Sequence, residues 1–144
     1  MYDVVIGTKS NIQDFVMIHV GNGTGTIVGD YCSITHHCTL HGCTIGDNCL
    51  IGINSTIMDG AKIGANSIVA GNSIVRENSV FPENSIIAGV PAKVVGTRDN
   101  GAANALNAAM YQRFAGGYAE GRDRLDESEV AEIMALYKGE ASAD

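Results

Sequence analysis

Residues 43–87 read CTIGDNCLIGINSTIMDGAKIGANSIVAGNSIVRENSVFPENSII, and every sixth position carries a large apolar side chain. These repeat positions are Ile45, Ile51, Ile57, Ile63, Val69, Val75, Phe81 and Ile87. A Cys, Ser or Ala stands two positions before each of them, and an Asn or Gly stands three positions after most of them. A period of six residues indicates a solenoid, because each repeat supplies one short strand and one turn.

The residue types fit such a coil. Aliphatic and small side chains fill a narrow core, and Asn or Gly tolerates the positive φ of the turns. Three repeats make one triangular coil, and coils stack about 4.8 Å apart, like neighbouring strands. The same repeat continues upstream through Val28, Ile34 and Leu40, and before them through Ile6, Ile12 and Ile18. The chain resembles the hexapeptide-repeat proteins, and this resemblance implies a left-handed parallel β-helix, an all-β solenoid.

Composition narrows the functional classes. A chain of 144 residues is long enough for one domain, and 18 Gly without any Trp suit tightly wound coils. The net charge of −7 argues against a nucleic-acid surface. The apolar runs are too short to span a bilayer, and the first residues show no signal-peptide pattern. We therefore expect a cytoplasmic protein with neither nucleic acid nor membrane as its partner.

Four cysteines lie within a short stretch: Cys32, Cys38, Cys43 and Cys49. Each stands two positions before an aliphatic repeat position, where other repeats carry Ser or Ala. Their spacings of six, five and six residues also lack the short paired spacing of cysteine zinc sites. We predict buried free thiols that act as small apolar side chains. Reduced thiols agree with a cytoplasmic location.

The repeat stops near residues 89–93, which predicts a β-helix domain at 1–95 and a C-terminal helical extension at 96–144. Residues 102–119 predict an amphipathic α-helix, with one apolar face formed by Leu106, Met110, Phe114 and Tyr118. Residues 126–128 are expected to cap a second helix. We expect both helices to pack along the β-helix or against a neighbouring subunit, and the last six or so residues to be frayed.

Three of the four histidines follow the repeat in an informative way. His19 follows Ile18 and His41 follows Leu40, so both occupy one corner of successive coils. Their separation of 22 residues leaves a few extra residues, which the glycine-rich segment 21–25 can supply as a loop. Two imidazoles one coil apart can bind one metal ion, with Zn–N distances of about 2.0–2.1 Å.

His36 and His37 are interpreted differently from this pair. His36 stands two positions after Ile34, on another corner, and five extended residues span roughly 16 Å. It therefore cannot join the pair of its own chain, but it can join the pair of a neighbour around a threefold axis. This arrangement predicts a homotrimer with metal sites at the subunit interfaces. His37 has no evident partner and is expected to be an ordinary surface residue.

The segments Asn11-Ile12-Gln13-Asp14, Met17-Ile18-His19-Val20 and Ile34-Thr35-His36-His37-Cys38-Thr39-Leu40-His41-Gly42-Cys43 carry a more specific resemblance. In order and spacing they are similar to the gamma-class carbonic anhydrases, and the similarity extends to about residue 95. In that family the first and third histidines come from one subunit and the middle one from its neighbour. The resemblance implies His19, His36 and His41 as ligands of Zn2+, or of Fe2+ or Co2+, and reversible hydration of carbon dioxide to bicarbonate.

The resemblance also suggests roles for the first motif. Gln13 would lie near the metal-bound solvent, and Asp14 would pair with an arginine across the interface. By the repeat alone, Asp14 lies in line with His36 and would support that side chain instead. Asn11 belongs to the same motif, so Asn11, Gln13 and Asp14 are the catalytic candidates.

Two features depart from the family pattern. The ten residues before Asn11 contain no arginine, and the segment 21–25 lacks the glutamate that serves proton transfer. We therefore expect a carbonic anhydrase with weak or absent turnover. A hexapeptide acyltransferase or thioesterase acting on a coenzyme A thioester, with one histidine as general base, is the first alternative. A non-catalytic trimeric assembly subunit is the second.

Overall fold

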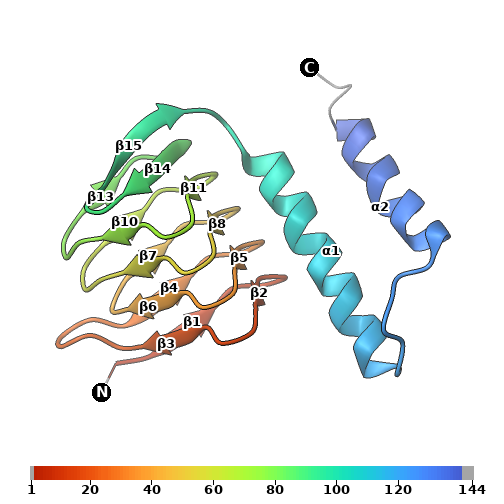
Figure 1. Ribbon diagram of the computed structural model, residues 1–144, viewed down its shortest axis with the longest axis horizontal. Helices are drawn as coiled ribbons and strands as arrows, with labels where there is room; N and C mark the ends of the chain where they lie inside the picture. Colours follow the sequence, from red (N-terminus) through yellow and green to blue (C-terminus); the bar gives the residue numbers. More distant parts are fainter. Residues whose placement is uncertain (1, 141–144) are drawn as a thin grey trace.

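The computed structural model describes residues 2–140, and it describes no side chains for 136–140. The chain forms a left-handed parallel β-helix flanked by two α-helices (Figure 1). The first sheet contains β1 (Val4–Ile6), β4 (Thr26–Val28), β7 (Thr44–Ile45), β10 (Lys62–Ile63) and β13 (Val80–Phe81). The second contains β2 (Asn11–Ile12), β5 (Ser33–Ile34), β8 (Leu50–Ile51), β11 (Ile68–Val69), β14 (Ser85–Gly89) and β15 (Ala92–Thr97). The third contains β3 (Met17–His19), β6 (Thr39–His41), β9 (Thr56–Ile57) and β12 (Ile74–Val75).

The strand register follows the predicted repeat. Ile63 of β10 pairs with Phe81 of β13, one regular coil of 18 residues later. The first coil is longer, because Ile6 of β1 pairs with Val28 of β4. The segment between β3 and β4 takes up the extra residues, and its turn is closed by Gly21 N–H donating to the Thr24 carbonyl at 2.8 Å. The predicted loop is confirmed.

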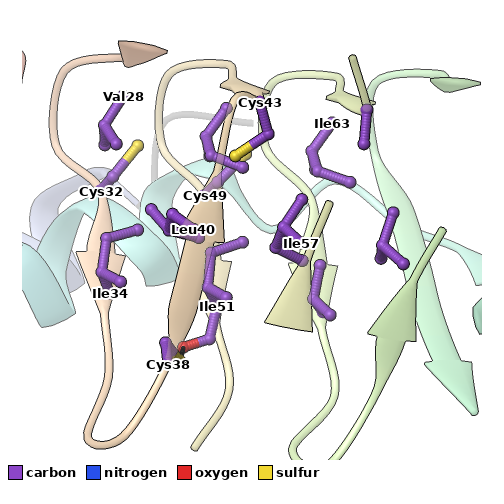
Figure 2. Close-up of a cluster of buried hydrophobic side chains, with 14 of the residues drawn as sticks. Val28, Cys32, Ile34, Cys38, Leu40, Cys43, Cys49, Ile51, Ile57 and Ile63 are labelled. Atoms are coloured by element: carbon purple, nitrogen blue, oxygen red, sulfur yellow. Dashed lines mark hydrogen bonds between the residues drawn. The ribbon is translucent and has the colours of Figure 1, made fainter. Parts of the chain in front are cut away.

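The core is a single column of apolar side chains inside the coils (Figure 2). Ile34, Ile51 and Val69 are 0% exposed, and the sulfur atoms of the four buried, free cysteines fill the gaps between the aliphatic side chains. The prediction of buried thiols is confirmed. The first coil differs: Ile6 is 38% exposed and Ile12 is 40% exposed, because no coil covers them on the outer side.

The turns adopt positive φ, mostly at Asn or Gly as predicted. Turn residues of successive coils form columns, and in one column Asn54 Nδ2 donates to Asn72 Oδ1 of the next coil at 2.8 Å. In the same column, the first two coils place Phe15 at φ 62° and His37 at φ 60°. Bulky residues adopt this conformation at an energetic cost. Their rings stack with centroids 4.9 Å apart and an interplanar angle of 10°. The expectation that His37 has no partner was therefore wrong.

The β-helix ends in a hairpin. β14 pairs with β15 in antiparallel fashion, from Ser85 opposite Thr97 to Gly89 opposite Ala92. The hairpin turn coincides with the segment 89–93, where the repeat was expected to stop, and the last strand continues to Thr97. The division into a domain at 1–95 and an extension at 96–144 stays a prediction.

Helix α1 (Gly101–Ala119) lies along the second sheet, where it contacts β2 and β5 (Figure 1). One asparagine of the helix anchors it to the coils: Asn104 Nδ2 donates to the Asn48 carbonyl at 2.8 Å and to the Ser67 carbonyl at 3.2 Å. The apolar face predicted from Leu106, Met110, Phe114 and Tyr118 is observed only in part: the first three are half-buried and Tyr118 is 62% exposed, while the fully buried positions are Asn104, Ala108 and Gly117. The surface of a β-helix offers carbonyl groups that a buried amide side chain can satisfy.

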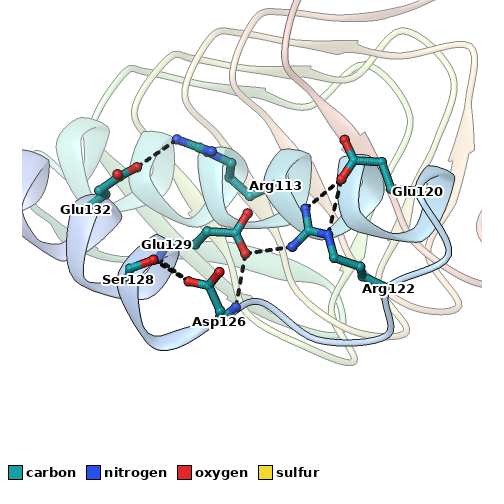
Figure 3. Close-up of polar contacts among 7 residues, drawn as sticks. All are labelled: Arg113, Glu120, Arg122, Asp126, Ser128, Glu129 and Glu132. Carbon is teal, nitrogen blue, oxygen red and sulfur yellow. Dashed lines mark hydrogen bonds and ion pairs between the residues drawn. The ribbon is translucent and has the colours of Figure 1, made fainter.

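Helix α2 (Glu127–Glu140) packs on the outer side of α1 (Figure 3). Its start is capped by Asp126, within the predicted residues 126–128, in a capping box: Asp126 Oδ1 accepts from the Glu129 N–H at 2.9 Å, and Glu129 Oε2 accepts from the Asp126 N–H at 3.0 Å. Arg122 bridges Glu120 and Glu129 at 2.9 and 2.8 Å. The predicted frayed end falls largely on residues 141–144, outside the described residues. Within residues 2–140, neither helix is both long and apolar enough to cross a membrane.

Candidate functional site

The first cluster of candidate residues is the histidine pair at the end of the third sheet. His19 and His41 are direct partners in the parallel register of β3 and β6, as the sequence predicted. Their rings stack with centroids 5.1 Å apart, and His19 Nδ1 lies 3.3 Å from His41 Nε2. His19 is exposed and His41 is half-buried, so one chain presents two imidazoles side by side at one corner.

A carboxylate completes this corner, and sequence reasoning missed it. Asp59 Oδ1 lies 2.7 Å from His41 Nδ1, on the side of the ring away from His19. The strand register pairs Leu40 with Ile57, so the repeat places Met58 opposite His41 and Asp59 one position further on, where the sequence pattern gave no signal for it. A carboxylate that accepts the proton of one ring nitrogen fixes the imidazole tautomer and leaves the other nitrogen free to bind a ligand.

The third histidine occupies the other predicted corner. His36 follows β5 and lies one coil away from Asp14. The two coils are joined here by the His37 N–H, which donates to the Asp14 carbonyl at 3.1 Å. Asp14 Oδ2 lies 3.3 Å from His36 Nδ1, and the two side chains are 79% and 39% exposed. This pairing agrees with the interpretation that Asp14 supports His36. The Nε2 atom of His36 is then available for another partner.

Asn11 and Gln13 form a fixed polar pair on the same side of the β-helix. Asn11 Nδ2 donates to Ser33 Oγ at 2.9 Å, and Gln13 Nε2 donates to Asn11 Oδ1 at 3.1 Å. The Oε1 atom of Gln13 is buried and has no hydrogen-bond partner among the described residues. A buried acceptor without a partner favours a bound water or ligand donor at this point.

These polar residues line a cavity of about 450 Å³ between the second sheet and α1. The β-helix contributes Asn11, Gln13, Asp14 and His36 to its wall, and α1 contributes Tyr111, Phe114 and Tyr118. The sequence did not indicate that the helix aromatics face the candidate catalytic residues, because their spacing fits core packing equally well. The cavity therefore joins a polar wall to an aromatic one, which is typical of small-molecule sites.

The chain by itself brings together two of the three predicted metal ligands. Among the side chains that the structure describes, in residues 2–135, no three of His, Cys, Asp or Glu gather into a metal site. The donor types nevertheless fit a metal such as zinc, because imidazole nitrogens are its common ligands and His41 has a supporting carboxylate. The structure thus offers a half-site at His19 and His41 and a single donor at His36.

Comparison with known proteins agrees with this fold. Residues 42–77 match the family described as Bacterial transferase hexapeptide (six repeats). The chain is similar to a protein of Methanocaldococcus jannaschii named "Probable carbonic anhydrase", with 50% identity over 52 residues, or 36% of this chain and 33% of that protein. The chain thus spans about a third of the length of this curated relative.

Two solved structures share the architecture. A hexapeptide transferase family protein from Anaplasma phagocytophilum has 25% sequence identity and a TM-score of 0.64, covering 96% of this chain and 75% of that one. A serine acetyltransferase in complex with coenzyme A, from Brucella abortus strain S19, has 28% identity and a TM-score of 0.52, covering 65% of this chain and 40% of that one. The repeat, the strand register and these similarities together show a left-handed β-helix built from hexapeptide repeats.

Proposed function

We propose that this chain acts as a gamma-class carbonic anhydrase-like metalloprotein in a homotrimer. In each metal site, His19 and His41 of one subunit and His36 of a neighbouring subunit would hold a zinc, iron(II) or cobalt ion. The observation that carries the proposal is the division of the histidines into a stacked pair on one corner and a single residue on another. A site divided in this way is complete only when a second copy contributes its share.

The roles of the chain's own residues follow from their contacts. A bound metal ion would supply Lewis acidity that activates a water molecule. Gln13 offers its unpartnered Oε1 to orient a small polar ligand, and Asn11 holds the Gln13 amide in place. Asp14 contacts His36 Nδ1, which leaves Nε2 of that ring available to bind the metal ion. These residues would bind and orient the ligand, and the aromatic side chains of α1 form the opposite wall of the cavity.

We expect hydration of carbon dioxide to be slow. Rapid turnover requires a group that passes protons to solvent, and the segment 21–25 between β3 and β4 contains no carboxylate. Stopped-flow hydration assays on zinc- and iron-loaded protein would measure this directly. Turnover near that of fast family members would contradict the expectation of weak activity.

A subunit-mixing experiment tests the shared site. The His36→Ala and His41→Ala proteins should each bind no stoichiometric metal, because each lacks one ligand at every site. Unfolded together and refolded as a mixture, the two variants should regain one metal ion per mixed trimer, at the interface that combines His41 of one subunit with His36 of the other. Metal content by mass spectrometry, together with the oligomeric state by light scattering, reports the result.

Two outcomes would count against the proposal. Full metal occupancy in the His36→Ala protein would show that the site lies within one chain. Mixed trimers that assemble without regaining metal would show that the three histidines do not share an ion. The His37→Ala protein is a suitable control, since His37 stacks on Phe15 and belongs to neither group of ligands.

The cavity beneath α1 favours a second candidate, acyl transfer or thioester hydrolysis with a coenzyme A substrate. Its volume of about 450 Å³ and its aromatic wall suit a larger ligand than carbon dioxide. His36 beside Asp14 has the arrangement of a general base oriented by a carboxylate. In this mechanism His36 would take a proton from the attacking hydroxyl group as the thiolate of coenzyme A leaves.

Metal content separates the two candidates. Protein purified without chelators that contains no stoichiometric metal, yet releases coenzyme A from acetyl-coenzyme A, would favour the second candidate. Release that persists in the His36→Ala protein would exclude His36 as the base. A metal-free protein that is inactive in both assays would leave the non-catalytic assembly subunit as the better description.

A further inference from the structure

The corner that holds the histidine pair continues into the next coil. His19, His41 and Asp59 follow one another along the solenoid, joined by contacts of 3.3 Å and 2.7 Å. Among the described residues, His41 Nδ1 is the one hydrogen-bond partner of the Asp59 carboxylate. The carboxylate is 37% exposed and His41 is 31% exposed, so the contact is partly shielded from water.

Two glycines make room for this carboxylate. A Cβ atom on Gly21 would lie 2.0 Å from Asp59 Oδ1, and one on Gly42 would lie 2.2 Å from the same oxygen. Gly21 has no positive φ, so its backbone conformation is open to other residues. The space that a side chain would take, rather than the turn geometry, therefore requires glycine at this position.

Gly42 supports the same interpretation. Its φ of 60° could be adopted by an asparagine, as Asn54 and Asn66 do at equivalent φ elsewhere in the coil. An asparagine at 42 would nevertheless place its Cβ against the Asp59 carboxylate. Two chain segments, 21–25 and the turn after β6, thus leave a space that Asp59 occupies.

The contact determines which nitrogen of His41 is free. A carboxylate accepts hydrogen bonds, so His41 carries its proton on Nδ1 and presents Nε2 as a lone pair. That nitrogen points toward His19. We propose that Asp59 is a positioning residue, which holds His41 in the tautomer and orientation needed to bind the shared metal ion through Nε2. This inference rests on the proposed function for the metal, but the tautomer can be measured without it.

Substitution of Asp59 provides the first arm of the test. Loss of a carboxylate behind a ligating histidine weakens metal binding by about 10–100-fold. We expect a loss of this size for Asp59→Ala and a smaller one for Asp59→Asn, whose amide oxygen can still accept the proton. Zinc competition titrations against a chelator measure the affinities. Asp47→Asn is the matched control, because Asp47 accepts from the Asp30 N–H at 2.8 Å on another corner.

Nitrogen-15 NMR of the metal-free protein provides the second arm. The wild-type protein should show His41 protonated at Nδ1, and Asp59→Ala should shift the ring toward protonation at Nε2. Gly21→Ala should have a similar effect, because its Cβ displaces the carboxylate while Asp59 itself remains. Circular dichroism establishes that each variant retains the β-helix.

The outcomes separate this inference from the proposed function. Unchanged zinc affinity and an unchanged His41 tautomer in folded Asp59→Ala would overturn the positioning role, even if the trimer binds metal. If the wild-type protein binds no metal but Asp59→Ala alters the tautomer, the proposed metal function fails while the orienting contact is supported.

Discussion

Cys43 and Ala61 occupy the same place in successive coils, since Ile45 and Ile63 pair directly two residues later. Burial raises the pKa of the Cys43 thiol from its ordinary value of 9.0 to about 12. Between these values the unfolded chain releases the thiol proton and the folded chain keeps it. The contribution of this group to stability is therefore complete below pH 9 and is lost as the pH rises toward about 12.

The expected result is a free energy of unfolding that falls with rising pH in this range, and falls less in Cys43→Ala. Alanine fits the position, as Ala61 demonstrates with 0% exposure. Urea unfolding at about pH 8 and about pH 10.5 measures the two slopes. Equal slopes in the wild-type and Cys43→Ala proteins would show that the Cys43 thiol ionises as readily in the folded chain as in the unfolded one.

At the scale of elements, the strands were predictable and the helix packing was not. Each short strand carries one aliphatic residue of the six-residue repeat, so the positions of the core side chains followed from the sequence alone. For α1, the boundaries followed from composition, but the buried face did not. Asn104 is 3% exposed and forms its hydrogen bonds with carbonyl groups of two different coils, which no local pattern of apolar residues indicates.

Contacts that join distant parts of the chain also account for the residues that were missed in the candidate site. Asp59, Tyr111 and the Phe15–His37 stack come close to the predicted residues only through contacts between coils or with α1. The repeat period places residues on corners, and it did so correctly for His19, His41, His36 and Asp14. It gives no information on a helix that lies outside the repeat.

The asparagine contacts lead to a prediction for α1. Asn104→Ala would leave the Asn48 and Ser67 carbonyls without this donor, which costs about 1–3 kcal/mol for buried groups. We expect α1 to open more often, with faster amide hydrogen exchange in 101–119 and little change in the β-helix strands. Gln112→Ala, at an exposed position of the same helix, is the control. If residues 101–119 exchange their amide hydrogens as slowly in Asn104→Ala as in Gln112→Ala, other contacts hold the helix.

At the scale of the whole molecule, the β-helix has two different ends. The β14–β15 hairpin covers one end, while the strands β1, β2 and β3 form the outermost coil at the other. The histidine pair lies in the two coils nearest that open end, and α1 runs beside the same coils. Both candidate corners are thus built on the first two coils, beside α1.

The separation of His36 from the pair formed by His19 and His41 also has a thermodynamic consequence. In the proposed trimer, each ion would bind two chains, so metal binding and subunit association would be one coupled equilibrium. Dilution of the protein should then release metal, and a chelator should dissociate the trimer without denaturing the coils. Analytical ultracentrifugation across a range of protein and chelator concentrations would detect this coupling. In such a system, the amount of available metal would determine how much of the protein exists as an assembled trimer.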